Sequence, residues 1–263
     1  VDVTHPEFYI FLLLAVSVGL PFFVLSTNSP LMQAWLERRH PGRSPYWLYS
    51  LSNIGSILGL LAYPVLIEPS LTLPWQGWIW GGSFILFVLL AGANAFLTLK
   101  KSAAPASVEK NAPEQQPTSK NTTTLWLLLS ACATLLLLAV TNQITQEVAA
   151  IPFLWVLPLT LYLLSFVLTF SGRSWYHRGF FTLLLLAGSI GWFLLTINPT
   201  MNFVLEIIVY NFLLFSACMV CNGELYALRP PASQLTRFYL MGSIGGALGG
   251  LFVPAHLDRP VFS

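Results

Sequence analysis

The 263-residue chain is poor in charged side chains. Asp, Glu, Lys and Arg make up 8% of its residues, whereas a soluble domain carries roughly a quarter. A water-soluble chain of this size needs far more polar surface to cover its core, so an ordinary soluble domain is excluded. The net charge is +2 and the basic residues are dispersed, so we expect no nucleic-acid partner.

Cysteines and clusters of metal ligands are also scarce. Cys132, Cys218 and Cys221 all lie in apolar runs, which argues against a secreted disulfide framework. Residues 218–225, CMVCNGEL, contain a C-x-x-C pair with no second ligand pair, and apolar surroundings make such thiols unreactive. None of the four histidines pairs with a cysteine or carboxylate at ligand spacing, and no nucleophile with a base is visible. We expect no metal, no cofactor and no catalytic residues.

Apolar residues are abundant instead, at 56% hydrophobic and 14% aromatic. A membrane-spanning helix needs about 20 mainly apolar residues, and the bilayer forces such segments to be helical because each must satisfy its own backbone polar groups. The sequence predicts an all-α integral membrane protein, with the lipid bilayer as its first partner. About eight transmembrane helices are expected, near residues 8–27, 46–67, 77–99, 124–142, 151–171, 179–197, 202–222 and 235–253.

One long polar segment, residues 101–122, interrupts this pattern with Ala, Pro, Ser and charged residues. It divides the chain into residues 1–100, with three predicted spans, and residues 123–263, with five. Its composition is typical of a flexible linker. The alternative is an ordinary long loop between two helices.

The basic residues predict an orientation. Alternating the spans places eleven of the twelve Lys and Arg residues on one side, which the positive-inside rule makes cytoplasmic. The linker 101–122 is then cytoplasmic and Val1 lies outside. These residues are Arg38, Arg39, Arg43, Lys100, Lys101, Lys110, Lys120, Arg173, Arg178, Arg229 and Arg237.

Several polar residues in or near the spans are candidates for function. Glu206 and Glu224 are costly in a bilayer, although each lies within about a turn of a predicted helix end, where interfacial water can solvate it. Asn211, Cys218 and Asn222 share one helix face, which either lines a substrate cavity or forms interhelical hydrogen bonds. Asn53, in the second span, is a further candidate.

A second polar cluster, TNQITQE, covers residues 141–147 and includes Asn142, Gln143 and Glu147. Pro152 and Pro158 follow it, and proline at such points frees carbonyl groups that transporters use at binding sites. The alternative is an extracellular turn followed by a helix that opens with proline. STNSP, residues 26–30, is a similar interruption in the first apolar run.

The last span contains GSIGGALGG, residues 242–250. Its glycines repeat every four residues, as in faces where two membrane helices approach closely. A nucleotide-binding loop is excluded because that fingerprint needs a preceding strand and a βαβ unit. The predicted packing residues are Gly242, Gly245, Gly246, Gly249 and Gly250.

Five motifs in order carry a family resemblance. They are SVGLPFFVLSTNSPLMQAW, HPGRSPYWLYSLSNIGSILGLLAYPVLIEP, AAIPFLWVLPLTLYLLSFVL, CNGEL and TRFYLMGSIGGALGGLF. Together they resemble the membrane part of fused major facilitator/spermidine synthase proteins. The resemblance implies a bacterial inner-membrane protein with a partial major facilitator-like bundle, which full-length members join to a cytoplasmic aminopropyltransferase-like domain.

The chain departs from the family pattern in three ways. It ends at Ser263 without the synthase-like domain, so we expect no enzymatic activity from it. The parity of its spans implies that N-terminal helices are missing. Asn222 stands where the family pattern has His before Gly-Glu-Leu, which weakens a titrating role for that position.

Two functions follow from these features. The first is a transporter-like module that binds or moves a small solute, such as a polyamine, in a cavity between the two helical parts. A polyamine site should offer carboxylates near mid-membrane, whereas both glutamates lie toward helix ends. The second is a non-transporting anchor that holds a cytoplasmic synthase-like domain at the membrane.

Overall fold

The computed structural model describes residues 6–40, 44–102, 119–147, 155–172, 175–198, 202–231 and 234–257. Within these ranges the regular structure is helical throughout, without a strand. The helices are α1 (Pro6–Leu14), α2 (Leu20–Arg39), α3 (Trp47–Ala62), α4 (Glu68–Ser70), α5 (Leu73–Ser102), α6 (Lys120–Glu147), α7 (Val156–Phe170), α8 (Arg178–Ile197), α9 (Phe203–Ala227) and α10 (Leu235–Leu257), with π-helical turns η1 (Ala15–Gly19) and η2 (Tyr63–Ile67).

Six helical segments in the described ranges are long and apolar enough to cross a membrane. This confirms an all-α chain of membrane type but gives fewer spans than the eight expected. The difference lies in α7 and α10. The 15 residues of α7 extend about 22 Å, short of the roughly 30 Å hydrocarbon core, and the glycines and Arg237 of α10 lower its hydropathy.

The predicted interruption at residues 26–30 does not end a helix. Instead α2 continues through Pro30 to Arg39. Proline removes a backbone hydrogen bond and clashes with the preceding turn. Two of the described prolines lie at π-helical turns, since Pro21 is the second residue after η1 and Pro64 lies within η2. Such local widening lets a membrane helix pass a proline.

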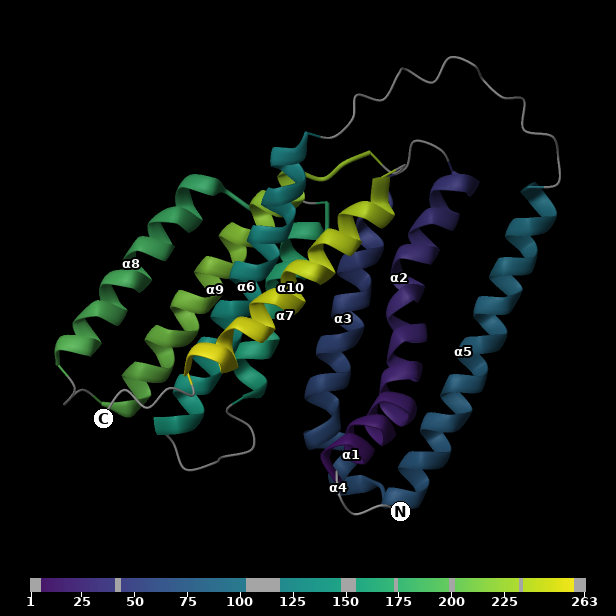
Figure 1. The fold of residues 1–263 in the computed structure, drawn as a ribbon, viewed down its shortest axis with the longest axis horizontal. Coiled ribbons are helices and arrows are strands. Elements are labelled where there is room, and N and C mark those ends of the chain that lie inside the picture. The colour runs from purple at the N-terminus through teal and green to yellow at the C-terminus, as the bar shows by residue number, and fades with distance from the viewer. Residues whose placement is uncertain are drawn as a thin grey trace.

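The helices form a packed group and a looser one (Figure 1). In the packed group α10 lies along α6, α9 packs on α6, α7 and α8, and α3 joins it through α7. Trp126, Leu214 and Met219 are fully buried there. In the looser group α2 touches α3 and α10, whereas α5 stands apart, and none of the 18 residues of its apolar span is buried.

Large apolar side chains cover the outer faces of these helices. Trp78, Leu89 and Phe96 on α5 and Leu183 on α8 are more than half exposed. An apolar surface this extensive is out of place in water and is typical of helices that contact lipid. We conclude that the bilayer is a partner of this multi-pass chain.

The helix ends that carry the basic residues lie together. The C-terminal ends of α2, α5 and α9 and the N-terminal ends of α3, α6, α8 and α10 share one end of the molecule (top of Figure 1), which we call the basic end. Two long-range hydrogen bonds join it: Tyr46 Oη donates to the carbonyl of Pro230 at 2.5 Å, and Trp126 Nε1 donates to that of Leu228 at 3.0 Å. Val1 and residues 103–118 of the predicted linker lie outside the described residues.

Candidate functional site

A cavity of about 460 Å³ lies between α2 and α3 on one side and α6, α7, α9 and α10 on the other. We call it the central cavity. Its size falls in the range of roughly 300–1,000 Å³ that is usual for small-molecule sites. Its walls come from both parts of the chain that flank the linker.

Three helices present the cavity lining with helical spacing. On α2 the lining residues are 22, 25, 26, 29 and 30; on α3 they are 49, 52, 53 and 56; on α10 they are 238, 239, 242, 243 and 246. Steps of three and four residues keep side chains on one face of a helix. The cavity is therefore lined by matching faces of three helices, and α6, α7 and α9 complete the wall.

The lining is aromatic and hydroxyl-rich, without a charged side chain among its described residues. The aromatic members are Phe22, Tyr49, Tyr162, Phe166, Phe170, Phe238 and Tyr239. The polar members, apart from the tyrosines, are Ser26, Ser29, Ser52, Asn53, Ser56, Ser130, Thr134 and Ser243. Apolar walls with a few placed polar groups are the usual make-up of a ligand pocket.

Gln33 holds α2 against α10 beside this cavity. Tyr239 Oη donates to Gln33 Oε1 at 2.8 Å, and Gln33 Nε2 donates to Ser29 Oγ at 3.3 Å. The glutamine side chain is fully buried. Sequence reasoning missed Gln33, although an amide four residues after Ser29 in an apolar helix is the pattern that would have indicated it.

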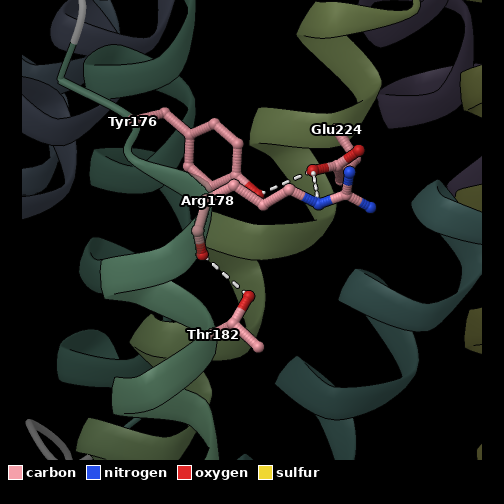
Figure 2. Close-up of polar contacts among 4 residues, drawn as sticks. All are labelled: Tyr176, Arg178, Thr182 and Glu224. Carbon is pink, nitrogen blue, oxygen red and sulfur yellow. Dashed lines mark hydrogen bonds and ion pairs between the residues drawn. The ribbon is translucent and has the colours of Figure 1, made fainter.

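Glu224 lies at the basic end, where it pairs with residues of the α7–α8 connection (Figure 2). Arg178 Nε lies 3.1 Å from Glu224 Oε1, and Tyr176 Oη donates to the same oxygen at 2.9 Å. Thr182 Oγ1 donates to the carbonyl of Arg178 at 2.7 Å. Burial, together with the hydrogen bond to Glu224, raises the pKa of Tyr176, so its hydroxyl stays protonated and available as a donor.

Gly223 allows this contact, because a Cβ there would overlap the ring of Tyr176. Sequence reasoning identified Glu224 but not Tyr176, and it read Arg178 only as a basic loop residue. No short-range pattern joins residues 48 positions apart, so their pairing depends on how α8 docks against α9. Glu224 does not line the central cavity; its carboxylate joins α9 to the start of α8.

We expect the hydrogen bond from Tyr176 to matter more than the ion pair with Arg178. The Arg178 side chain is 79% exposed, and pairs screened by solvent contribute about 0–1 kcal/mol. Glu224→Gln keeps an acceptor for Tyr176, whereas Glu224→Leu leaves the hydroxyl without one, which costs about 1–3 kcal/mol. In detergent the thermal unfolding midpoint should be highest for wild type, lower for Glu224→Gln and lowest for Glu224→Leu. If the Gln and Leu variants lost equal amounts of thermal stability, the ion pair with Arg178 would be the contact that stabilises the protein.

The amides predicted on α9 are buried rather than exposed to a cavity. Asn222 is fully buried and its Nδ2 donates to Ser165 Oγ on α7 at 2.8 Å. Asn211 Nδ2 donates to the carbonyl of Ile207 at 2.8 Å. The Oδ1 atoms of both are buried without a hydrogen-bond partner in the described structure. Neither residue lines the central cavity, and Asn222 acts as an interhelical contact.

The remaining predicted polar residues are scattered. Asn53 lines the central cavity, and its Nδ2 donates to the carbonyl of Tyr49 at 2.8 Å. Asn142 is half-buried on α6, while Gln143 lines a second, mostly apolar groove of about 440 Å³ among α6, α8 and α9. Glu206 is half-buried in the first turn of α9, where the helix N-terminus stabilises a carboxylate.

TNQITQE is not a turn at all, because α6 runs through it to Glu147. The side chain of Glu147 lies outside the described residues, as does Pro152. Pro158 lies in the first turn of α7 and is fully buried. Proline is tolerated there because the first backbone N–H groups of a helix have no intrahelical partner.

The five glycines of α10 are not equivalent. Gly245 and Gly249 lie against the backbone of α6, so that a Cβ on either would overlap the carbonyl of Leu127 or Ala131. Gly242, Gly246 and Gly250 leave room for a methyl group, the nearest atoms lying 3.4–3.8 Å from the added Cβ. The close approach of α10 to α6 therefore depends on Gly245 and Gly249 and not on the other three glycines.

The cysteines are free thiols; Cys132 is exposed, and Cys218 and Cys221 are buried. Among the described residues no group of three or more His, Cys, Asp or Glu side chains is placed to hold a metal ion. Comparison with protein-family models, with curated proteins and with solved structures gave no match.

Proposed function

We propose that this chain is the membrane part of a transporter-like protein of the fused major facilitator/spermidine synthase type, and that it binds or moves a small solute in the central cavity. In this proposal α7 and α10 also cross the membrane, which completes eight spans of a partial major facilitator-like bundle. The basic end faces the cytoplasm of a bacterial inner membrane, following the positive-inside rule.

The observation that carries the proposal is the position of the central cavity. Its walls come from α2 and α3 before the linker and from α6, α7, α9 and α10 after it. In many transporters the substrate site lies where two helical repeats meet.

Uptake into proteoliposomes tests this proposal. The full chain should take up a labelled solute above the level of empty vesicles, and Ser56→Trp, which fills the cavity from α3, should abolish uptake. Leu58→Trp is the matched control, because Leu58 is 63% exposed on the same helix and does not line the cavity. Equal uptake by the two variants would place transport elsewhere or exclude it.

The anchor function is the second candidate, and the basic end favours it. Glu224 accepts a hydrogen bond from Tyr176 and Asn222 donates one to Ser165, so both contact neighbouring segments rather than a cavity. Tyr46 and Trp126 donate to carbonyls of the chain after α9 and hold it in place. Such a rigid end suits the attachment of a cytoplasmic synthase-like domain. An anchor predicts that Ser56→Trp leaves every activity of the full-length protein unchanged.

A further inference from the structure

We propose that the central cavity selects uncharged, hydrogen-bonding solutes with an apolar face and disfavours polycations such as spermidine. The inference rests on the proposed function, since it names the substrate class of the same site. It differs from the expectation raised by the family resemblance, under which a polyamine is the natural solute.

The lining offers no counter-charge. None of the described residues around the central cavity is ionisable near neutral pH, and the neighbouring Glu224 is already held by Arg178 and Tyr176. An ion that leaves water for a low-dielectric site needs a partner of opposite charge to offset its desolvation. Spermidine carries several positive charges, so each would enter the cavity uncompensated.

The polar groups of the lining suit a neutral partner. Ser26 Oγ donates to the carbonyl of Phe23 at 2.9 Å and Ser56 Oγ donates to that of Ser52 at 3.2 Å. Their hydroxyl protons are thereby used within the helices, and their oxygens remain as acceptors. Hydroxyl oxygens accept from the O–H and N–H groups of a solute but supply no counter-charge, and aromatic side chains match an apolar face, so the lining meets all the needs of an uncharged solute and only part of those of a polycation.

The aromatic rings do not form an open cation cage. Tyr49 meets Phe166 at a centroid distance of 5.4 Å and an angle of 78°, and Tyr162 meets Phe166 at 5.1 Å and 81°. Phe238 and Tyr239 meet at 5.2 Å and 69°. A cation–π site needs a cation over a free ring face, whereas six of the seven described rings that line the cavity contact another ring, and Phe22 alone has no ring partner.

Charge-matched thiol reagents test the inference without a known substrate. Ser56→Cys is made in a Cys132→Ala background, because Cys132 is the exposed native thiol. Three methanethiosulfonates of similar size carry a hydroxyethyl, a trimethylammonium-ethyl or a sulfonatoethyl group. In each reaction the thiolate attacks the sulfenyl sulfur, a disulfide forms and methanesulfinate leaves. The rate of each reagent with Ser56→Cys is divided by its rate with 2-mercaptoethanol in solution, which corrects for differences in intrinsic reactivity.

We expect the uncharged reagent to modify Ser56→Cys about tenfold faster than either charged reagent after normalisation, because only the charged reagents lose ionic hydration in the cavity. Adding Ser52→Asp, at an exposed position of the lining, places a carboxylate one helical turn away and should raise the rate of the cationic reagent about tenfold. The Cys132→Ala parent without the introduced thiol gives the background.

Every other outcome overturns the inference. A cationic reagent as fast as the neutral one shows a cavity that admits cations, and an equally fast anion shows no neutral selectivity. No modification by any reagent shows that polar solutes do not reach the cavity. If the thiol reagents showed the expected charge selectivity but proteoliposomes took up no solute, transport would be contradicted and the selection of uncharged solutes would stand. The two proposals can therefore fail separately.

Discussion

Gly249→Ala is expected to lower the thermal unfolding midpoint of the protein strongly, although it adds a single methyl group. That methyl would overlap the backbone carbonyl of Ala131 on α6, which cannot rotate away as a flexible side chain would. We expect a loss of about 3 kcal/mol, the upper part of the range for overpacking. In a protein of this size that corresponds to a fall of about 6–12 °C.

Gly250→Ala is the matched control, being the same substitution one residue further along α10. Its Cβ would lie 3.8 Å from Leu138 Cδ1, at ordinary contact distance. Alanine also favours a helix over glycine by about 1 kcal/mol, so this variant should be neutral or slightly stabilised. Gly245→Ala should follow Gly249→Ala, because its Cβ would meet Leu127. Similar midpoints for Gly249→Ala and Gly250→Ala would contradict the packing of α10 on α6.

Asn222→Asp should destabilise the protein by about 4 kcal/mol at neutral pH. The change is nearly isosteric, but it places a carboxylate at a position that is fully buried, beside the hydroxyl of Ser165. A buried carboxyl group resists ionisation by about 3 pH units, each worth 1.36 kcal/mol. The loss should shrink in acid, where the carboxyl group is protonated in both the folded and the unfolded states.

Asn222→Leu separates the burial of charge from the loss of the hydrogen bond. Leucine removes the bond to Ser165 Oγ, but Ser165 still donates to the carbonyl of Tyr162 at 2.6 Å, and the unsatisfied Oδ1 of Asn222 disappears. We expect a loss of about 1 kcal/mol, near the value of interhelical hydrogen bonds in membranes. Unfolding curves at several pH values would measure both variants. An Asp variant as stable as the Leu variant at neutral pH would show that water reaches this position.

The sequence predicted the existence of helices well because hydropathy is local. Apolar runs near 179–197 and 202–222 became α8 and α9 with ends within a few residues. Helix ends at polar and proline-containing stretches were predicted worse. Residues 26–30 and 141–147 looked like breaks, but hydroxyl side chains such as Ser26 and Thr145 donate to carbonyls of the preceding turn, so their polar groups are satisfied inside a continuous helix.

The candidate site was predictable only in part, because it depends on which helices meet. Glu224 and Asn53 stood out as polar residues in apolar segments. The contacts around the site could not be predicted from the sequence. Tyr176 reaches Glu224 only because α8 packs on α9, and Gln33 contacts Tyr239 from the other end of the chain. Glycine spacing predicted the packing face of α10 but could not distinguish Gly249 from Gly250, because that choice depends on the rotation of α10 against α6.

Solute binding to the purified chain is the most direct test of the central cavity as a functional site. A panel of charged and uncharged solutes, spermidine included, is screened by thermal unfolding with wild type, Ser56→Trp and Leu58→Trp. We predict that at least one uncharged solute raises the midpoint of wild type and Leu58→Trp and leaves Ser56→Trp unchanged. No stabilising solute, or one that stabilises Ser56→Trp equally, would contradict a binding site between the two helical parts.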